Sequence, residues 1–149
     1  MANRALPGGG FRHGEKDPGG PYLGDMLSMR RAFLTLYAVT ADRAWLRRTE
    51  EAVQFISAHF KADVGYLTSA GAAELKWKPE VDENVGVTRL ANLLHHYTGK
   101  AQYTQIAENA MHFLAASGVA DRRDFPGSRH SPGRQRTQSC SATPHECGS

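Results

Sequence analysis

The chain has 149 residues, 40% of them hydrophobic, and a formal net charge of +3, which suits one ordinary domain with an apolar share slightly below the usual one. Residues 1–117 carry 13 basic and 12 acidic side chains and residues 118–149 carry 5 and 3, so the body lacks the basic footprint of a nucleic-acid-binding protein. No apolar run approaches the roughly 18 residues of a membrane span, and the start MANRALPGGG has no apolar signal segment, so we expect no membrane partner and a cytoplasmic protein.

Four segments have apolar residues three and four positions apart, the spacing of amphipathic helices. They run from about Asp25 to Val39, Arg43 to Phe60, Glu83 to Tyr97 and Ala101 to Ala116. The residues expected to be buried are Met26, Met29, Phe33, Leu36 and Tyr37; Trp45, Thr49, Ala52, Val53, Ile56 and Phe60; Leu90, Leu93, Leu94 and Tyr97; and Tyr103, Ala107, Ala110, Met111 and Leu114. The predicted fold class is all-α.

The helices and the turns between them repeat at an offset of 58 residues. This shift places Leu36 on Leu94 and Thr40 on Thr98, and the register holds through the turn without a gap. The repeating unit is therefore an antiparallel αα-hairpin that is used twice, in residues 1–117. Each hairpin has one strong apolar face and needs a neighbour to cover it, so uncovered faces predict self-association.

The composition changes abruptly after residue 117. Residues 118–149 are rich in Arg, Ser, Pro and Gly and have one aromatic residue, too little apolar surface to offset the entropy of ordering. Two interpretations stay open: a disordered basic tail, or the product of a frameshifted or truncated reading frame. Cys140 and Cys147 lie in this segment with a spacing that fits no common zinc pattern, so we name no metal ligand.

The opening stretch GGGFRHGEKDPGGPYLGD, residues 8–25, contains the most concentrated polar chemistry. His13, Glu15 and Asp17 alternate, so on an extended chain their side chains share one side. Such a group could do acid–base catalysis or hold a polar ligand, or it is simply a solvated loop. Tyr22 follows a glycine-proline turn and either stacks on a sugar or wedges against the first helix.

Two further features have two interpretations each. Asp82, Glu83 and Asn84 open the third helix, either as ordinary residues of a helix N-terminus or as a polar cluster at the mouth of a helical barrel. Arg31 and Arg89 occupy equivalent positions of the repeat and either bond loop carbonyls or bind an anion.

The stretches GGPYLGD, RAFLTLYAVTADRAWL and DENVGVTRLANLLHHYTGKAQYTQIAENAMHFLA resemble the helical region of the thioredoxin-domain-containing family related to spermatogenesis-associated protein 20. The likeness covers about residues 8–116. That family joins a thioredoxin-like domain to a helical domain similar to the (α/α)6 barrels of six-hairpin glycosidases and N-acylglucosamine 2-epimerases. A role in carbohydrate metabolism is the expectation, and it is an analogy of fold.

The resemblance implies a site at the barrel mouth, with His13, Glu15 and Asp17 as catalytic residues. The residues implied to bind the sugar are Tyr22, Asp25, Asp82, Glu83 and Asn84. The chain has no C-x-x-C, so no redox activity is expected and no cofactor is named. Because the four helices are a third of the roughly twelve in such a barrel, we expect a partial (α/α)6 barrel or toroid, a fragment of the larger domain. The alternatives are a non-catalytic helical interaction module and a truncated product without independent activity.

Overall fold

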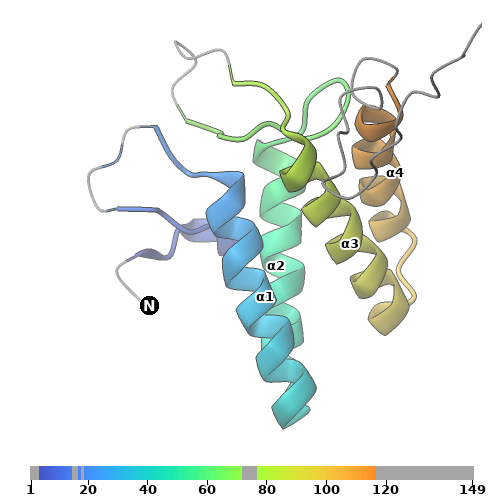
Figure 1. Ribbon diagram of the computed structural model, residues 1–149. Coiled ribbons are helices and arrows are strands. Elements are labelled where there is room, and N and C mark those ends of the chain that lie inside the picture. The colour runs from blue at the N-terminus through green and yellow to red at the C-terminus, as the bar shows by residue number, and fades with distance from the viewer. Residues whose placement is uncertain (1–3, 15–16, 18, 72–76, 117–149) are drawn as a thin grey trace, which may run out of the picture.

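The computed structural model describes residues 4–14, 17, 19–71 and 77–116 (Figure 1). This part of the chain contains a short 3-10 helix, η2 (Pro7–Gly9), and the α-helices α1 (Leu23–Thr40), α2 (Arg43–His59), α3 (Val81–Thr98) and α4 (Gln102–Ala115). The predicted all-α class is confirmed, since backbone pairing between extended segments in these ranges is limited to isolated bridges. Glu15 and the predicted tail, 118–149, lie outside the described residues.

All four predicted helices are present, and each bound lies within two residues of its prediction. Asp42 caps α2 as expected, because its carboxylate accepts a hydrogen bond from the Ala44 N–H at 2.8 Å. Gly99 ends α3 in the left-handed conformation, with a φ of 68°. The largest difference is at the N-terminus of α1 and of α3, where each helix begins two residues before its predicted start.

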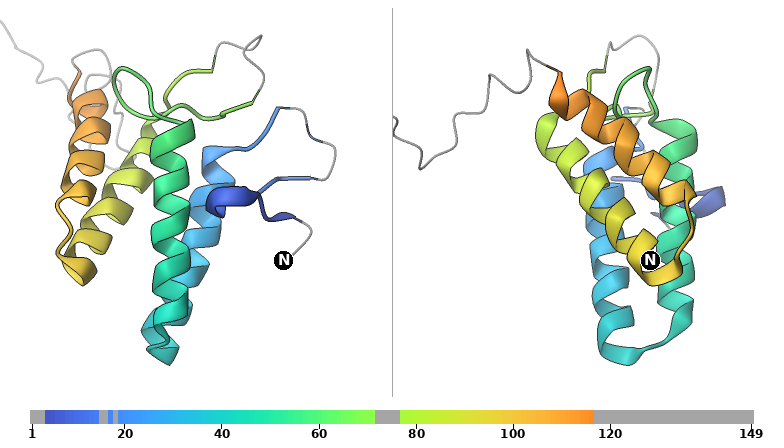
Figure 2. Two further views of the ribbon diagram at one scale, coloured as in Figure 1. Left: turned by 180° about the vertical axis from the view of Figure 1, so that it is seen from behind. Right: turned by 90° about the vertical axis from the view of Figure 1, so that its right-hand side faces the viewer.

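The helices form two antiparallel hairpins that stand next to each other (Figure 2). α1 pairs with α2, α3 pairs with α4, and α1 also contacts α3. As a result α1 and α3 both begin at one end of the bundle, where α2 and α4 both end (Figure 1). Loop residues 60–71 and 77–80 cross this end, so the two positive helix termini and the longest described loops share one end of the molecule.

The 58-residue repeat is present in the geometry of the two turns. The Thr40 hydroxyl donates to the Leu36 carbonyl at 2.7 Å, and its equivalent Thr98 donates to the Leu94 carbonyl at 2.7 Å. The next residue is left-handed in both hairpins, with a φ of 55° at Ala41 and 68° at Gly99. The two halves therefore share backbone conformation as well as sequence register.

The core lies between the two hairpins and is closed by the loops. Most predicted core residues are buried there, with others from the loops: Met26, Phe33, Thr49, Ala52, Val53, Ile56, Phe60, Tyr66, Leu90, Leu94, Tyr103, Ala107, Ala110 and Leu114. The prediction was wrong for Leu36, Leu93, Tyr97 and Met111, which are exposed. Met29, Tyr37 and Trp45 are half-buried. Periodicity places these side chains on an apolar stripe, but no described element covers that part of the stripe.

The second hairpin has an open face where the first hairpin is covered. Val53 on α2 is fully buried, whereas Met111, its equivalent on α4, is 47% exposed. A hollow of about 280 Å³ lies beside Met111, and Val85, Thr88, Arg89, Leu114 and Ala115 complete its lining. We call these six residues the open face. Of the described helices, none is long and apolar enough to cross a membrane.

Candidate functional site

The candidate site is at the start of α1, where the N-terminal arm, residues 4–14, contacts the helix through Phe11 and His13. His13 Nδ1 lies 3.0 Å from Oδ2 and 3.3 Å from Oδ1 of Asp25. Asp25 is in the first turn of α1, where the helix dipole favours a negative charge. The His13 side chain is 68% exposed, so its ring meets solvent while the carboxylate holds it. The carboxylate can thus orient the imidazole and leave its second nitrogen available for proton exchange.

Asp17 and Tyr22 make a second polar pair in the same segment. Asp17 Oδ1 accepts a hydrogen bond from the Gly19 N–H at 2.9 Å and one from the Tyr22 hydroxyl at 3.3 Å. Desolvation, together with the negative charges of Asp17 and Asp25, raises the pKa of Tyr22. The phenol therefore stays protonated and remains a donor at neutral pH. His13, Asp17, Tyr22 and Asp25 are called the polar cluster below.

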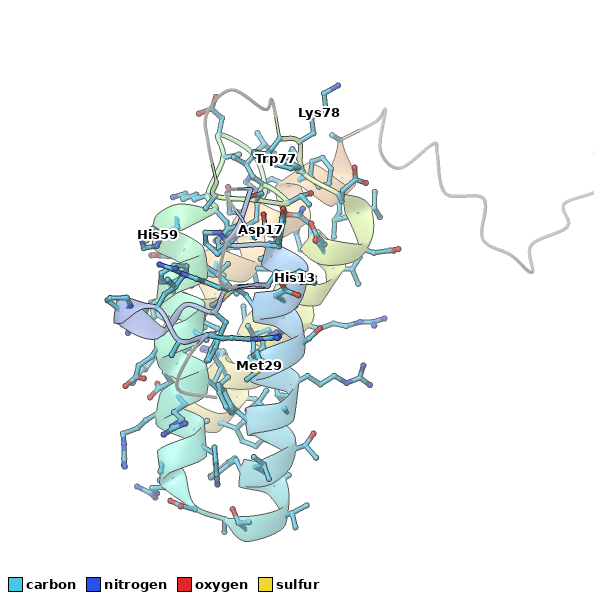
Figure 3. All side chains as sticks on the ribbon, turned by 90° about the vertical axis from the view of Figure 1, so that its left-hand side faces the viewer. His13, Asp17, Met29, His59, Trp77 and Lys78 are labelled. Atoms are coloured by element: carbon cyan, nitrogen blue, oxygen red, sulfur yellow. The ribbon has the colours of Figure 1, made fainter. Side chains whose placement is uncertain are left out.

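Tyr22 stands between two aromatic rings. Its ring centroid is 6.0 Å from that of His13 and 6.1 Å from that of Trp77, and both contacts are edge-to-face. Figure 3 shows His13 and Asp17 at the same end of the bundle as Trp77. The Trp77 Nε1–H is buried and has no hydrogen-bond partner among the described residues. The three rings therefore form an edge-to-face row beside the carboxylates of Asp17 and Asp25.

A loop far away in sequence holds this turn in place. The Ser69 hydroxyl donates to the carbonyls of Gly19 and Pro21, the latter at 3.2 Å. The Gly71 N–H in turn donates to Ser69 Oγ at 3.0 Å. A Cβ atom on Gly71 would lie 2.1 Å from the Gly19 carbonyl oxygen, so only glycine fits. Residues 19–22 are therefore clamped to residues 68–71.

Glu83 reaches the same end of the bundle from the first turn of α3. Its carboxylate lies against the backbone of Gly24, where an added Cβ would be 3.3 Å from Oε1. Oε2 is buried without a partner among the described residues. Burial raises the pKa of Glu83, more than the Thr68 hydroxyl and the Gly24 backbone lower it. A half-buried carboxyl with a raised pKa is suited to donate a proton.

The structure brings some predicted site residues together and separates others. Asn84 is fully buried, and its amide accepts from the Tyr66 N–H at 2.8 Å and donates to the carbonyls of Tyr66 and Glu80. The Asn84 side chain therefore holds the loop that contains Tyr66 against the start of α3. Asp82 is exposed, and its side chain makes no hydrogen bond or ion pair with the polar cluster among the described residues. Because Glu15 lies outside the described residues, its assignment stays a prediction.

A hollow of about 240 Å³ adjoins the His13–Asp25 pair. Arg4, Arg12 and Ser28 supply its polar lining, and Phe11 and Met29 its apolar lining. The space is smaller than the roughly 300–1,000 Å³ of a typical ligand pocket, so it suits one small polar group. In the described ranges, no three His, Cys, Asp or Glu side chains are grouped closely enough to hold a metal ion.

Sequence reasoning missed Ser69 and left two interpretations of Trp77 open, stacking on a sugar or covering an edge of the core. Neither residue lies on a helix or in a recognisable motif, and each reaches the start of α1 through contacts with residues 19–22. A short run rich in Ser, Gly and Ala gives no periodic signal from which that contact could be predicted.

The arrangement places an exposed imidazole held by a carboxylate, a protonated tyrosine and a half-buried carboxyl of raised pKa at one end of the bundle. Comparison with protein-family models, with curated proteins and with solved structures gives no match to this chain.

Proposed function

We propose that this chain is a fragment of the six-hairpin glycosidase-like domain of a thioredoxin-domain-containing protein, with a role in carbohydrate metabolism. In this proposal the polar cluster binds a sugar or does acid–base chemistry on it. The observation that carries the proposal is the His13–Asp25 pair, which lies beside Tyr22 at the end where α1 and α3 both begin. The pair is exposed on its outer side, as a group that meets a ligand must be.

The arrangement of the hairpins supports an arc of an (α/α) barrel. Two hairpins related by one sequence offset stand next to each other, with α1 beside α3. In a closed ring, further hairpins would pack beside these two in the same relative arrangement, and the next one would cover the open face. The ends of α1 and α3 would then border the mouth of the ring, which is where the polar cluster lies.

Each residue has a role in this proposal. His13, held by Asp25, exchanges a proton with a sugar hydroxyl or the glycosidic oxygen, and Asp17 supplies a second carboxylate. Glu15 keeps the catalytic role predicted for it from the sequence. The Tyr22 hydroxyl, which donates to Asp17, accepts a hydrogen bond from the sugar, and the Trp77 ring packs against the sugar. Glu83 and Asp82 come from α3, so both hairpins contribute to one ligand site.

Titration of the chain with a panel of monosaccharides and disaccharides, followed by calorimetry, tests the proposal. His13→Ala and Tyr22→Phe should each weaken sugar binding by about tenfold, the loss expected when one good hydrogen bond is removed. His112→Ala is the matched control, because His112 is an exposed histidine on α4. Binding that is equally strong in all four proteins, or no binding by the wild-type chain, would contradict the site.

The open face favours a second candidate function, that of a non-catalytic interaction module. Two of its apolar side chains, Met111 and Leu114, are the counterparts of Val53 and Ile56, which are fully buried in the first hairpin. A second copy of this chain is the partner that this candidate commits to, because it offers an equally apolar face. A chain that neither binds sugars nor associates would be a truncated product without independent activity.

A further inference from the structure

Three arginines meet at a groove of about 490 Å³ between α1 and α3. Arg30 and Arg31 come from α1 and Arg89 comes from α3, and the apolar lining includes Leu34, Leu93 and Tyr97. Arg31 and Arg89 are the pair that the 58-residue repeat places at equivalent positions. We call this the arginine groove. It is distinct from the hollow beside His13, with which it shares no lining residue.

Arg30 is a buried cation that no carboxylate of the described residues neutralises. It is only 9% exposed, and its guanidinium donates to the Leu27 carbonyl from Nε and to the Gly86 carbonyl from Nη2, both at 3.0 Å. These bonds use two of its five N–H donors. Burial, reinforced by the charge of Arg31, lowers the pKa of Arg30 to about 10, so it is still charged at neutral pH.

The groove as a whole is positive. The ten side chains and glycines that line it include no Asp or Glu, and no described carboxylate lies within 4.0 Å of a guanidinium nitrogen of the three arginines. Like charges in a partly desolvated site repel one another, and an anion between them removes that cost. The arginines come from two helices that Arg30 itself links through Gly86, so their spacing is set by the packing of α1 on α3.

We propose that the arginine groove binds a small organic anion, a carboxylate or phosphate monoester attached to a ring or short apolar body. Arg31 and Arg89 hold the anionic group from either side by bidentate hydrogen bonds, which the planar guanidinium favours. Arg30 adds positive charge from its buried position in the lining of the groove. Leu93 and Tyr97 cover the body of the ligand. The proposal does not depend on the sugar site, which lies at the end of the helices.

Calorimetric titration with phenyl phosphate, benzoate and the neutral benzyl alcohol tests this site. The wild-type chain should bind phenyl phosphate and benzoate and not benzyl alcohol, and the affinity should fall as salt is raised from about 20 to 150 mM. Comparison of the two anions shows whether phosphate or carboxylate is preferred. Inorganic phosphate alone, which lacks a ring, should bind more weakly than phenyl phosphate.

The double variant Arg31→Gln/Arg89→Gln should lose at least about tenfold in affinity for both anions. The double variant Arg43→Gln/Arg47→Gln removes the same charge from exposed positions on α2 outside the groove, and should bind within about twofold of the wild type. Circular dichroism checks that both remain helical. Equal losses in the two variants, equal binding of benzyl alcohol, or no binding of either anion by the wild type would overturn the proposal.

Discussion

Glu50 on α2 and Tyr103 on α4 join the two hairpins through a hydrogen bond of 2.8 Å, which the tyrosine hydroxyl donates to Oε1. The same oxygen lies 2.6 Å from Lys100 Nζ, and the Glu50 side chain is only 15% exposed. One carboxylate thus fixes the turn of the second hairpin onto the first. Its repeat equivalent, Glu108, is exposed on α4, where none of the other described helices covers it.

Replacing Tyr103 by Phe should destabilise the fold by about 1 kcal/mol, because Glu50 loses a hydrogen bond in a half-buried place. Urea denaturation followed by circular dichroism measures the change. Tyr97→Phe is the control, since Tyr97 is 43% exposed and its hydroxyl makes no hydrogen bond with the described residues. Equal stability of the two variants would show that the Glu50–Tyr103 bond does not link the hairpins.

The same bond predicts a pH dependence. Burial, the hydrogen bond to Glu50 and the charge of Glu50 raise the pKa of Tyr103 to about 12, whereas an unfolded tyrosine has about 10. The raised pKa means that the stabilisation is fully present below pH ~10 and is lost as pH rises toward ~12. The free energy of unfolding should fall over that range, and less steeply in Tyr103→Phe. A slope identical to the wild type would contradict the assignment.

Asn84→Ala should cost about 2 kcal/mol or more, because it leaves the buried N–H and carbonyl of Tyr66 without their partner. Asn92→Ala, at an exposed position on the same helix, should change stability by less than about 0.5 kcal/mol. Urea titration of both variants gives the comparison. If Asn84→Ala unfolds no more easily than Asn92→Ala, the hydrogen bonds of the Asn84 amide to Tyr66 do not stabilise the fold, and the ligand-binding role predicted for Asn84 becomes the better interpretation.

Gly71→Ala should release the clamp between residues 19–22 and 68–71. A Cβ atom would lie 2.1 Å from the Gly19 carbonyl oxygen, so one of the two loops must move. Trp77 fluorescence should change, since its ring contacts Tyr22 in the clamped turn, and the proposed sugar affinity should fall several-fold. Gly14→Ala is the control, because no atom of the described residues comes within 4 Å of its added Cβ. Unchanged fluorescence in Gly71→Ala would argue against the clamp.

The open face should make the chain self-associate at high concentration. Met111→Glu places a charge at the centre of that face and should shift the chain toward monomer. Light scattering coupled to gel filtration measures the mass across a concentration series. Glu108→Gln, which changes an exposed residue three positions before Met111 and outside the open face, should leave the association unchanged. A monomer at every concentration in the wild type would refute this prediction.

The helices could be predicted because the apolar period marks their faces. The Asp42 side chain also marks the start of α2, and Gly99 marks the end of α3. Periodicity does not say whether a neighbour covers the apolar stripe, so it could not predict that Val53 is buried and that its equivalent Met111 is exposed.

The sequence named residues of the candidate site but not the contacts among them. His13 and Asp25 were both named, yet their contact depends on how the arm folds back on α1. Asn84 was grouped with Asp82 and Glu83 because all three stand at a helix start, where capping and ligand binding give the same pattern. Only the packing of the loop residue Tyr66 on α3 distinguishes the buried Asn84 from the exposed Asp82.

Nuclear magnetic resonance of the isotope-labelled chain, titrated with monosaccharides, tests the proposed sugar site most directly. We expect the amide signals that move to belong to residues 11–13 and 22–25 and to Trp77, with those of the α2–α4 exposed faces unchanged. Saturating shifts confined to the arginine groove or the open face, or no shifts with any sugar, would contradict a sugar site at the start of α1.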